Sequence, residues 1–212
     1  MDEFKQKLWA KYEVCELGEA KHFLGIRIIR DRADQKLWLL QDSYIDKMAE
    51  KFHIKPTKIP KTPLPITDLV KYEGKATKSQ IQGYQQKVGT LNFPANITRP
   101  DVAKASSTLC QFLQNPSPDH IAAADQALEY MVGTKYRAIQ FNGKADFKQL
   151  FVMSSNSAFT DNPVTCYSSY RYTFSLFSGL IDWKAVKGKT VTLLSTEAEL
   201  LAITLTVKEF IQ

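Results

Sequence analysis

Apolar residues along the first forty positions follow a helical spacing and then a strand-like one. Phe4, Leu8 and Tyr12 recur every four residues among lysines, which is typical of one face of an amphipathic helix. Two runs rich in β-branched, leucine and aromatic residues follow at 22–29 and 36–40, separated by polar residues. Because such runs on either side of a polar turn are typical of paired strands, this part of the chain predicts a helix followed by a β-hairpin.

The next forty residues predict a short helix and then an extended linker. Asp42 or Ser43 is expected to cap the helix, because both side chains accept hydrogen bonds from free amide groups at a helix start. Beyond that helix, closely spaced prolines exclude regular structure and indicate a Pro/Lys-rich linker at 55–77. These prolines are Pro56, Pro60, Pro63 and Pro65.

Residues 78–136 keep helical spacing in three successive segments. Ser79 and Gln82 have the spacing of a capping box at the start of the first helix. The second helix is expected after Pro100, and the third begins at Ser117-Pro118, where proline suits the first turn. Gly133 is expected to end the third helix. Three amphipathic helices with short links predict a small helical region.

After Gly133 the pattern changes to short β-rich segments followed by one helix. The strands are expected at 138–141, 149–153, 170–177 and 180–183. The last helix is expected to begin at Ser195 or Thr196, with carboxylates in its first turn. The whole pattern predicts an α+β chain in four parts, which are 1–54, 55–77, 78–136 and 137–212.

Composition narrows the possible functions. A content of 44% hydrophobic residues in 212 positions excludes a disordered chain, and no run approaches the roughly 18 apolar residues of a membrane span. The three cysteines do not have the spacing of a zinc site or a disulfide framework. We therefore expect an intracellular protein, cytoplasmic or nuclear, with no membrane partner. Lys and Arg exceed Asp and Glu by 28 to 22, a net charge of +6 that favours a polyanionic partner.

Five short motifs follow one another along the chain. They are Glu-Leu-Gly-Glu-Ala-Lys-His-Phe-Leu-Gly-Ile at 16–26, the segments 84–91, 98–102 and 115–120, and Ser-Thr-Glu-Ala-Glu at 195–199. Together and in this order they resemble the Pol polyprotein of Ty1/copia-type retrotransposons, from the end of its reverse transcriptase into its ribonuclease H domain. The first motif resembles the stretch that includes the primer grip, and the last resembles the ribonuclease H signature. The resemblance implies a primer-grip hairpin, a thumb-like helical region and a truncated ribonuclease H-like mixed sheet with one helix.

The hairpin and the linker carry the candidate nucleic-acid-binding residues. Gly25 would allow a nucleic-acid backbone to approach closely, and Arg27 and Arg30 could neutralise phosphates. Lys58 and Lys61 belong to the basic linker, which could follow a duplex. A half-buried hairpin with a glycine bulge and a solvated basic linker explain the same residues equally well.

The candidate metal site is incomplete in the sequence. Ribonuclease H chemistry uses two divalent ions held by several carboxylates, and the resemblance implies Mg²⁺ in the intact family. Asn156 stands where the family has its first aspartate, and Glu199 matches the second acidic ligand. An amide is neutral and offers one ligand oxygen, so Asn156 cannot replace the carboxylate. Asp161 is either a partial substitute or a turn residue. The remaining ligands, and the paired aspartates of the polymerase, are expected outside 1–212.

These observations predict a degenerate fragment of a reverse transcriptase and ribonuclease H that is catalytically inactive, with residual affinity for an RNA–DNA hybrid or a duplex. No bound cofactor is expected, and Glu199 alone would hold a metal ion weakly. A second hypothesis is a domesticated protein-interaction module, and a third is a residual metal-dependent nuclease. Self-association through an open sheet edge is expected, because the C-terminal unit should expose a strand and the apolar residues Leu200, Ile203 and Phe210.

Overall fold

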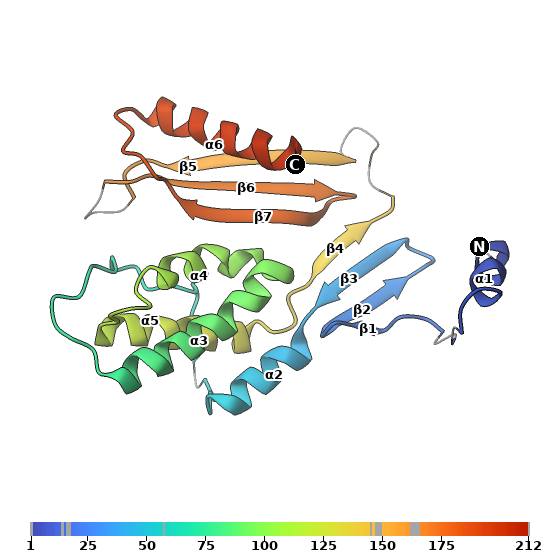
Figure 1. Cartoon of the computed structure of the whole chain (residues 1–212), viewed down its shortest axis with the longest axis horizontal. Helices are drawn as coiled ribbons and strands as arrows, with labels where there is room; N and C mark the ends of the chain where they lie inside the picture. The colour runs from blue at the N-terminus through green and yellow to red at the C-terminus, as the bar shows by residue number, and fades with distance from the viewer. Residues whose placement is uncertain are drawn as a thin grey trace.

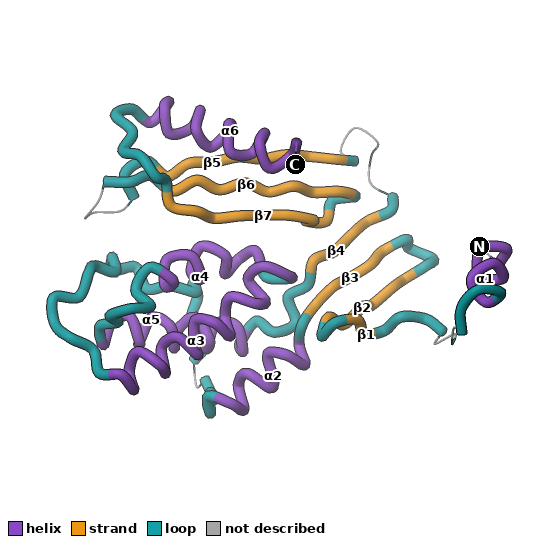
Figure 2. The backbone as a smooth tube through the Cα atoms, in the orientation of Figure 1, coloured by secondary structure: helices purple, strands orange, loops and turns teal. Residues whose placement is uncertain are grey.

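Two antiparallel sheets and six α-helices make up the described part of the computed structural model (Figures 1 and 2). The structure describes residues 2–13, 15, 18–56, 58–144, 146, 150–161 and 166–211. The predicted α+β class is confirmed. Of the helices in these ranges, none combines the length and the apolar character that a bilayer crossing requires.

The first sheet has the strand order β1-β2-β3-β4, with β1 (His22–Phe23), β2 (Ile26–Asp31), β3 (Lys36–Leu40) and β4 (Ile139–Asn142). The predicted single strand at 22–29 is wrong, because Leu24 and Gly25 have φ values of 49° and 79° and turn the chain between β1 and β2. A two-residue turn with two positive φ values matches the right-handed twist of the strands that it joins.

The strand β4 follows the predicted boundary between residues 136 and 137 but pairs within the first sheet. That boundary assigned β4 to the C-terminal unit, but Phe141 pairs with Leu37 and Ile139 with Leu39 of β3. About one hundred residues separate the two strands, so local pattern could not identify this pairing. The first sheet therefore contains segments from both ends of the helical region.

Four helices and one 3₁₀ turn surround the larger core. They are α2 (Asp42–Lys51), α3 (Lys78–Ile97), η1 (Pro100–Val102), α4 (Ala103–Cys110) and α5 (Pro118–Gly133), while α1 (Asp2–Trp9) lies apart at the N-terminus (Figure 1). Their fully buried side chains form one cluster, which includes Ile45, Tyr84, Leu91, Leu109, Leu128 and Met131. The three-helix prediction for 78–136 is confirmed.

Two of the predicted helix starts move by a residue or two. The capping box of α3 is Thr77 with Gln80, not Ser79 with Gln82, because the Thr77 hydroxyl accepts from the Gln80 amide and the Gln80 side chain accepts from the Thr77 amide. At α2 the N-cap is Gln41, which makes no side-chain cap. The start of α5 at Ser117-Pro118 is as predicted.

The second sheet has the order β5-β6-β7, from β5 (Phe151–Ala158), β6 (Ser169–Leu176) and β7 (Gly179–Lys187). Its described strands are all antiparallel, so the predicted mixed sheet is wrong. The connections are too short to hold the crossover helix that a parallel pair requires. Helix α6 (Ser195–Ile211) covers one face of the sheet, as Figure 1 shows. The predicted first residue of β5, Gln149, lies outside the described residues.

The opposite face of the second sheet packs on the helices. Trp183 of β7 is 9% exposed and donates its indole N–H to the Ala95 carbonyl oxygen of α3 at 2.7 Å. Lys104 of α4 contacts Asp161, which follows β5, at 2.7 Å, and Ser169 of β6 at 2.6 Å. The sheet therefore lies between α6 on one side and the α3–α4 pair on the other.

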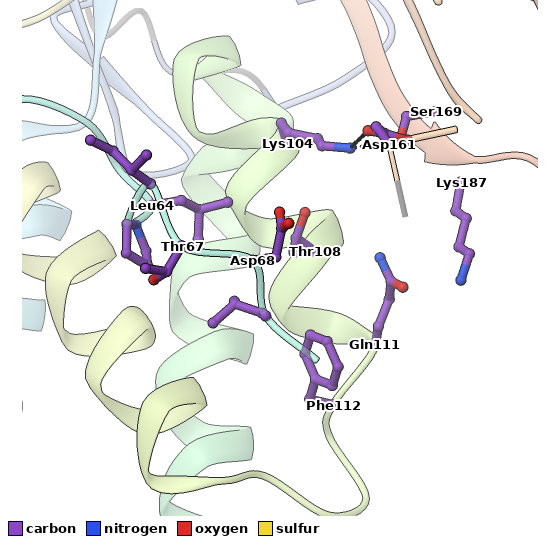
Figure 3. Close-up of a pocket in the computed structure, with 13 residues that line it drawn as sticks. Leu64, Thr67, Asp68, Lys104, Thr108, Gln111, Phe112, Asp161, Ser169 and Lys187 are labelled. Atoms are coloured by element: carbon purple, nitrogen blue, oxygen red, sulfur yellow. Dashed lines mark hydrogen bonds and ion pairs between the residues drawn. The ribbon is translucent and has the colours of Figure 1, made fainter. Parts of the chain in front are cut away.

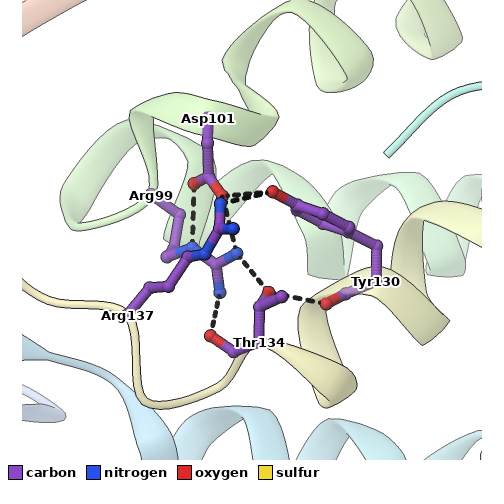
Figure 4. A network of polar contacts seen from close by, with 5 residues as sticks. All are labelled: Arg99, Asp101, Tyr130, Thr134 and Arg137. Atoms are coloured by element: carbon purple, nitrogen blue, oxygen red, sulfur yellow. Dashed lines mark hydrogen bonds and ion pairs between the residues drawn. The ribbon is translucent and has the colours of Figure 1, made fainter. Parts of the chain in front are cut away.

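A buried arginine joins the ends of two helices. Arg99, after α3, has a side chain that is 2% exposed and binds Asp101 through Nε and one terminal nitrogen, both at 2.8 Å (Figure 4). The same guanidinium donates to the backbone oxygen and the hydroxyl of Thr134, at the end of α5. A cation at this position stabilises carbonyls that have no partner within the helix. Asp101 also accepts from the Tyr130 hydroxyl and from Arg137.

The stability that this cluster gives to the fold should depend on pH through the charge of Asp101. Burial raises the pKa of Asp101, but the hydrogen bonds and charge of Arg99, assisted by Tyr130 and Arg137, outweigh that effect and leave the pKa below its ordinary value. A depressed folded-state pKa stabilises the fold above the unfolded value of about 3.9, and this stabilisation disappears as the pH falls through the folded value.

We therefore predict that the urea midpoint falls steeply below about pH 4 and that Asp101→Asn weakens this dependence. At pH 7 the same substitution should lower the free energy of unfolding by about 3–5 kcal/mol, because it leaves a buried guanidinium without its carboxylate. Circular dichroism across pH 3–7 measures both effects, with the exposed Asp119→Asn as control. Equal stability of the two variants at pH 7 would contradict this role.

Candidate nucleic-acid interface and carboxylate site

The two arginines expected to bind phosphates together lie on opposite faces of the first sheet. Successive side chains of a strand alternate between faces, and Arg27 and Arg30 are three residues apart on β2. Arg30 pairs across the sheet with Leu37, and Leu37 pairs with Phe141, so these three side chains share one face. Arg27 belongs to the other face. The structure therefore does not bring the two arginines into one phosphate-binding surface.

Arg27 is also occupied within the fold. Its guanidinium donates to the Asp42 carboxylate at 2.6 Å, next to the start of α2. Burial raises the pKa of Asp42, but the hydrogen bond from Arg27, the Ser43 amide and the Arg27 charge outweigh burial and lower the pKa. The carboxylate is therefore charged at neutral pH, and it offsets the positive charge of Arg27.

The β1–β2 turn explains why residue 25 is a glycine. A Cβ atom added there would meet nothing within 4 Å, whereas its φ of +79° is one that L side chains rarely adopt. The glycine therefore satisfies the backbone geometry of the β1–β2 turn. The surface beside it is open in this structure.

Lys58 and Lys61 lie against α5. They line a pocket of about 560 Å³ together with Asp125 and Glu129 of that helix. Asp125 is also paired with Lys87. Carboxylates beside the two lysines reduce the local positive potential. Helix α5, which they lie against, is apart from the β2–β3 hairpin (Figure 1).

Asn156 and Glu199 do not converge. The Phe151 and Phe210 rings meet with centroids 5.6 Å apart, so the side chain of Phe151 leaves β5 toward α6. Asn156, five residues later, leaves the strand on the other face. Glu199 is an exposed residue of α6 itself. Among the described residues, no three His, Cys, Asp or Glu side chains form a group that could hold a metal ion.

Of the two interpretations of Asp161, the contacts favour a structural one. Its carboxylate accepts from Lys104 at 2.7 Å and from the Ser169 hydroxyl at 2.7 and 2.8 Å. Figure 3 shows this cluster at one end of a pocket of about 280 Å³, whose opposite wall comes from linker residues such as Leu64 and Asp68. The pocket was not predicted from the sequence, because its walls come from three distant segments.

Comparison with known proteins identifies the relatives of this fold. The chain is 33% identical over 218 residues to the retrovirus-related Pol polyprotein from transposon TNT 1-94 of Nicotiana tabacum, covering 98% of this chain and 16% of that protein. It is 30% identical over 210 residues to a putative transposon Ty5-1 protein of Saccharomyces cerevisiae, covering 98% and 67%. The retrovirus-related Pol polyprotein from transposon RE1 of Arabidopsis thaliana is 32% identical over 192 residues.

These similarities define the class as retroelement Pol proteins, and the resemblance of the five motifs is confirmed. The chain belongs to the Ty1/copia-type retrotransposon Pol family. It spans about one sixth of the tobacco polyprotein. No protein-family model and no solved structure matches it.

The separation of Asn156 from α6 predicts that one substitution will not create a nuclease. Asn156→Asp should leave hydrolysis of an RNA–DNA hybrid at background, because the new carboxylate would face away from the helix of Glu199. A single carboxylate holds Mg²⁺ too weakly to position two ions. The measurement is cleavage of a labelled hybrid in Mg²⁺ or Mn²⁺ by the wild type, Asn156→Asp and Glu199→Ala. Cleavage that Glu199→Ala abolishes would contradict the proposed geometry.

Proposed function

We propose that this retroelement-derived chain binds nucleic acid without hydrolysing it. The observation that supports binding best is a group of cations at the far end of the β2–β3 hairpin. Arg30, Arg32 and Lys36 line one pocket there with Asp31. Arg32 and Lys36 form exposed ion pairs with Glu19 and Asp34, whereas Arg30 has no ion pair with any described residue. Cations that neutralise phosphates release counterions from the polymer, which makes binding salt-dependent. The proposed partner is an RNA–DNA hybrid or a duplex.

In this proposal the four parts of the chain keep the roles that the family suggests. The hairpin within 1–54 is a primer-grip element, 55–77 is a linker, and 78–136 is a thumb-like helical region. The unit within 137–212 is ribonuclease H-like, which the succession of three antiparallel strands and one helix supports. The position of Asn156 away from the helix of Glu199 supports the inactive state. No resident cofactor is proposed, and Mg²⁺ belongs to the intact family.

We predict that Arg30→Gln weakens hybrid binding more than the double substitution Lys58→Gln, Lys61→Gln. Arg30 makes no ion pair or side-chain hydrogen bond with any described residue, whereas the two lysines lie beside carboxylates. Loss of one phosphate contact should reduce the slope of log K against log salt by about 1. Fluorescence anisotropy at several salt concentrations measures this. A wild-type affinity that does not change between low and moderate salt would exclude the proposed binding.

A second candidate function, self-association, is favoured by the exposed outer edge of β5. All eight residues of this strand are uncharged, and the first six are exposed. Edge strands without charged residues are templates for pairing with another chain. The expected exposure of α6 is confirmed for Leu200, Ile203 and Phe210, at 63%, 49% and 54%, although Phe210 also contacts Phe151. A domesticated interaction module could use this surface.

If β5 mediates association, a lysine on it should reduce association. Ser155→Lys places a charge in the middle of the edge and should convert a dimer or larger assembly into monomer, because pairing would bury that charge. Gln111→Lys, on a different surface, adds the same charge and serves as control. Light scattering coupled to size exclusion gives the mass. A wild type that stays monomeric at high concentration would exclude this function.

A further inference from the structure

A pocket of about 550 Å³ lies where the two sheets meet. Its walls come from the distal part of the β2–β3 hairpin, the end of β4 and the β6–β7 turn, which Figure 1 shows side by side. Backbone hydrogen bonds hold these walls together, from the Asn142 amide to the Phe177 oxygen at 2.8 Å and from the Gly143 amide to the Gln35 oxygen at 2.8 Å. The volume is within the roughly 300–1,000 Å³ of small-molecule sites.

The aromatic wall of this pocket is held in an unfavourable backbone conformation. Leu176 pairs with Gly179, so Phe177 and Ser178 form a two-residue turn, with φ values of 50° and 63°. Such turns usually contain Asn and Gly, and a non-glycine residue in the left-handed region is strained. Phe177 nevertheless occupies the first position and is 39% exposed. Phe177 lines the pocket together with Phe141.

Three of the remaining lining residues, Arg30, Arg32 and Lys36, are cationic, and Lys36 pairs with Asp34 at 3.4 Å. Arg30 shares its sheet face with Leu37 and Phe141 and has no partner for its guanidinium among the described residues. The ion pair of Arg32 with Glu19 at 3.3 Å is exposed, and such pairs contribute little free energy. An uncommitted guanidinium beside aromatic rings can bind a phosphate and stack on a planar ring at the same time.

We propose that this pocket binds one unpaired nucleotide of a single-stranded nucleic acid, with its base on Phe177 and its phosphate on Arg30. The inference rests on the proposed nucleic-acid binding and adds an unpaired nucleotide to the hybrid or duplex proposed for the same surface. A base inside a duplex keeps both faces stacked on its neighbours, so it cannot also stack on Phe177, whereas an unpaired base can. The site therefore distinguishes single strands from duplex, which a basic surface alone does not.

The test compares two fluorescently labelled probes of equal length, a single-stranded oligo-dT and an RNA–DNA hybrid. Phe177→Leu should weaken oligo-dT binding about tenfold, since stacking on an aromatic side chain contributes that order of affinity, and should change hybrid binding less than about twofold. Phe177→Tyr retains the ring and should retain the affinity. Phe159→Leu, an equally exposed phenylalanine at 40%, is the matched control. Arg30→Gln should weaken the binding of both probes, and Lys208→Gln, which removes the same charge elsewhere, is the control.

The outcomes separate the pocket from the proposed function. If the wild type binds the hybrid, but it does not bind oligo-dT or Phe177→Leu and Phe159→Leu bind oligo-dT equally well, the pocket proposal is wrong and the proposed function stands. Equal losses of oligo-dT affinity in Phe177→Tyr and Phe177→Leu would also overturn the stacking role, because they would reflect a disturbed turn. If the wild type binds neither probe at low salt, both proposals are wrong.

Discussion

The hydrogen bond from Trp183 to the Ala95 carbonyl oxygen fixes how the second sheet meets the helices. Ala95 lies in the last turn of α3, where carbonyls have no donor within the helix, and a buried carbonyl without a partner is unfavourable by about 1–3 kcal/mol. The indole of β7 supplies that donor. Because side chains alternate along a strand, this bond determines which face of the sheet turns toward α3 and which toward α6. The orientation of Asn156 away from the helix of Glu199 follows from the same alternation.

Contacts on either side of this bond complete the junction between the second sheet and the rest of the structure. Lys104, Asp161 and Ser169 join α4 to the sheet near one end of the strands, and the backbone bond between Asn142 and Phe177 joins β4 to the β6–β7 turn at the other. The pocket beside Phe177 exists only because β4 belongs to the first sheet and meets the second. Its formation therefore depends on the packing of two segments that are distant in sequence.

The sequence predicted where helices and strands lie better than it predicted which of them pair or pack together. Spacing located the helices, the start of α5 at Ser117 and the closing helix, because these depend on residues within one or two turns. The pairing of β4 with β3 and the burial of Arg99 depend on residues that are distant in sequence. That Arg27 and Arg30 lie on opposite faces of the sheet could have been deduced from the sequence, since residues three apart on a strand face opposite ways. The net charge of +6 did not indicate where on the surface a nucleic acid would bind, because ion pairs such as Arg27 with Asp42 offset part of the charge locally.

Amide hydrogen exchange of the wild type and Trp183→Phe tests the central role of the junction most directly. The substitution keeps an aromatic ring but removes the indole donor. We predict faster exchange in both β7 and the last turn of α3, with the amides of β2 and β3 unchanged, because the bond couples the sheet to that helix end. Faster exchange confined to β7, or no change in either element, would contradict the view that this bond holds the two parts of the structure together.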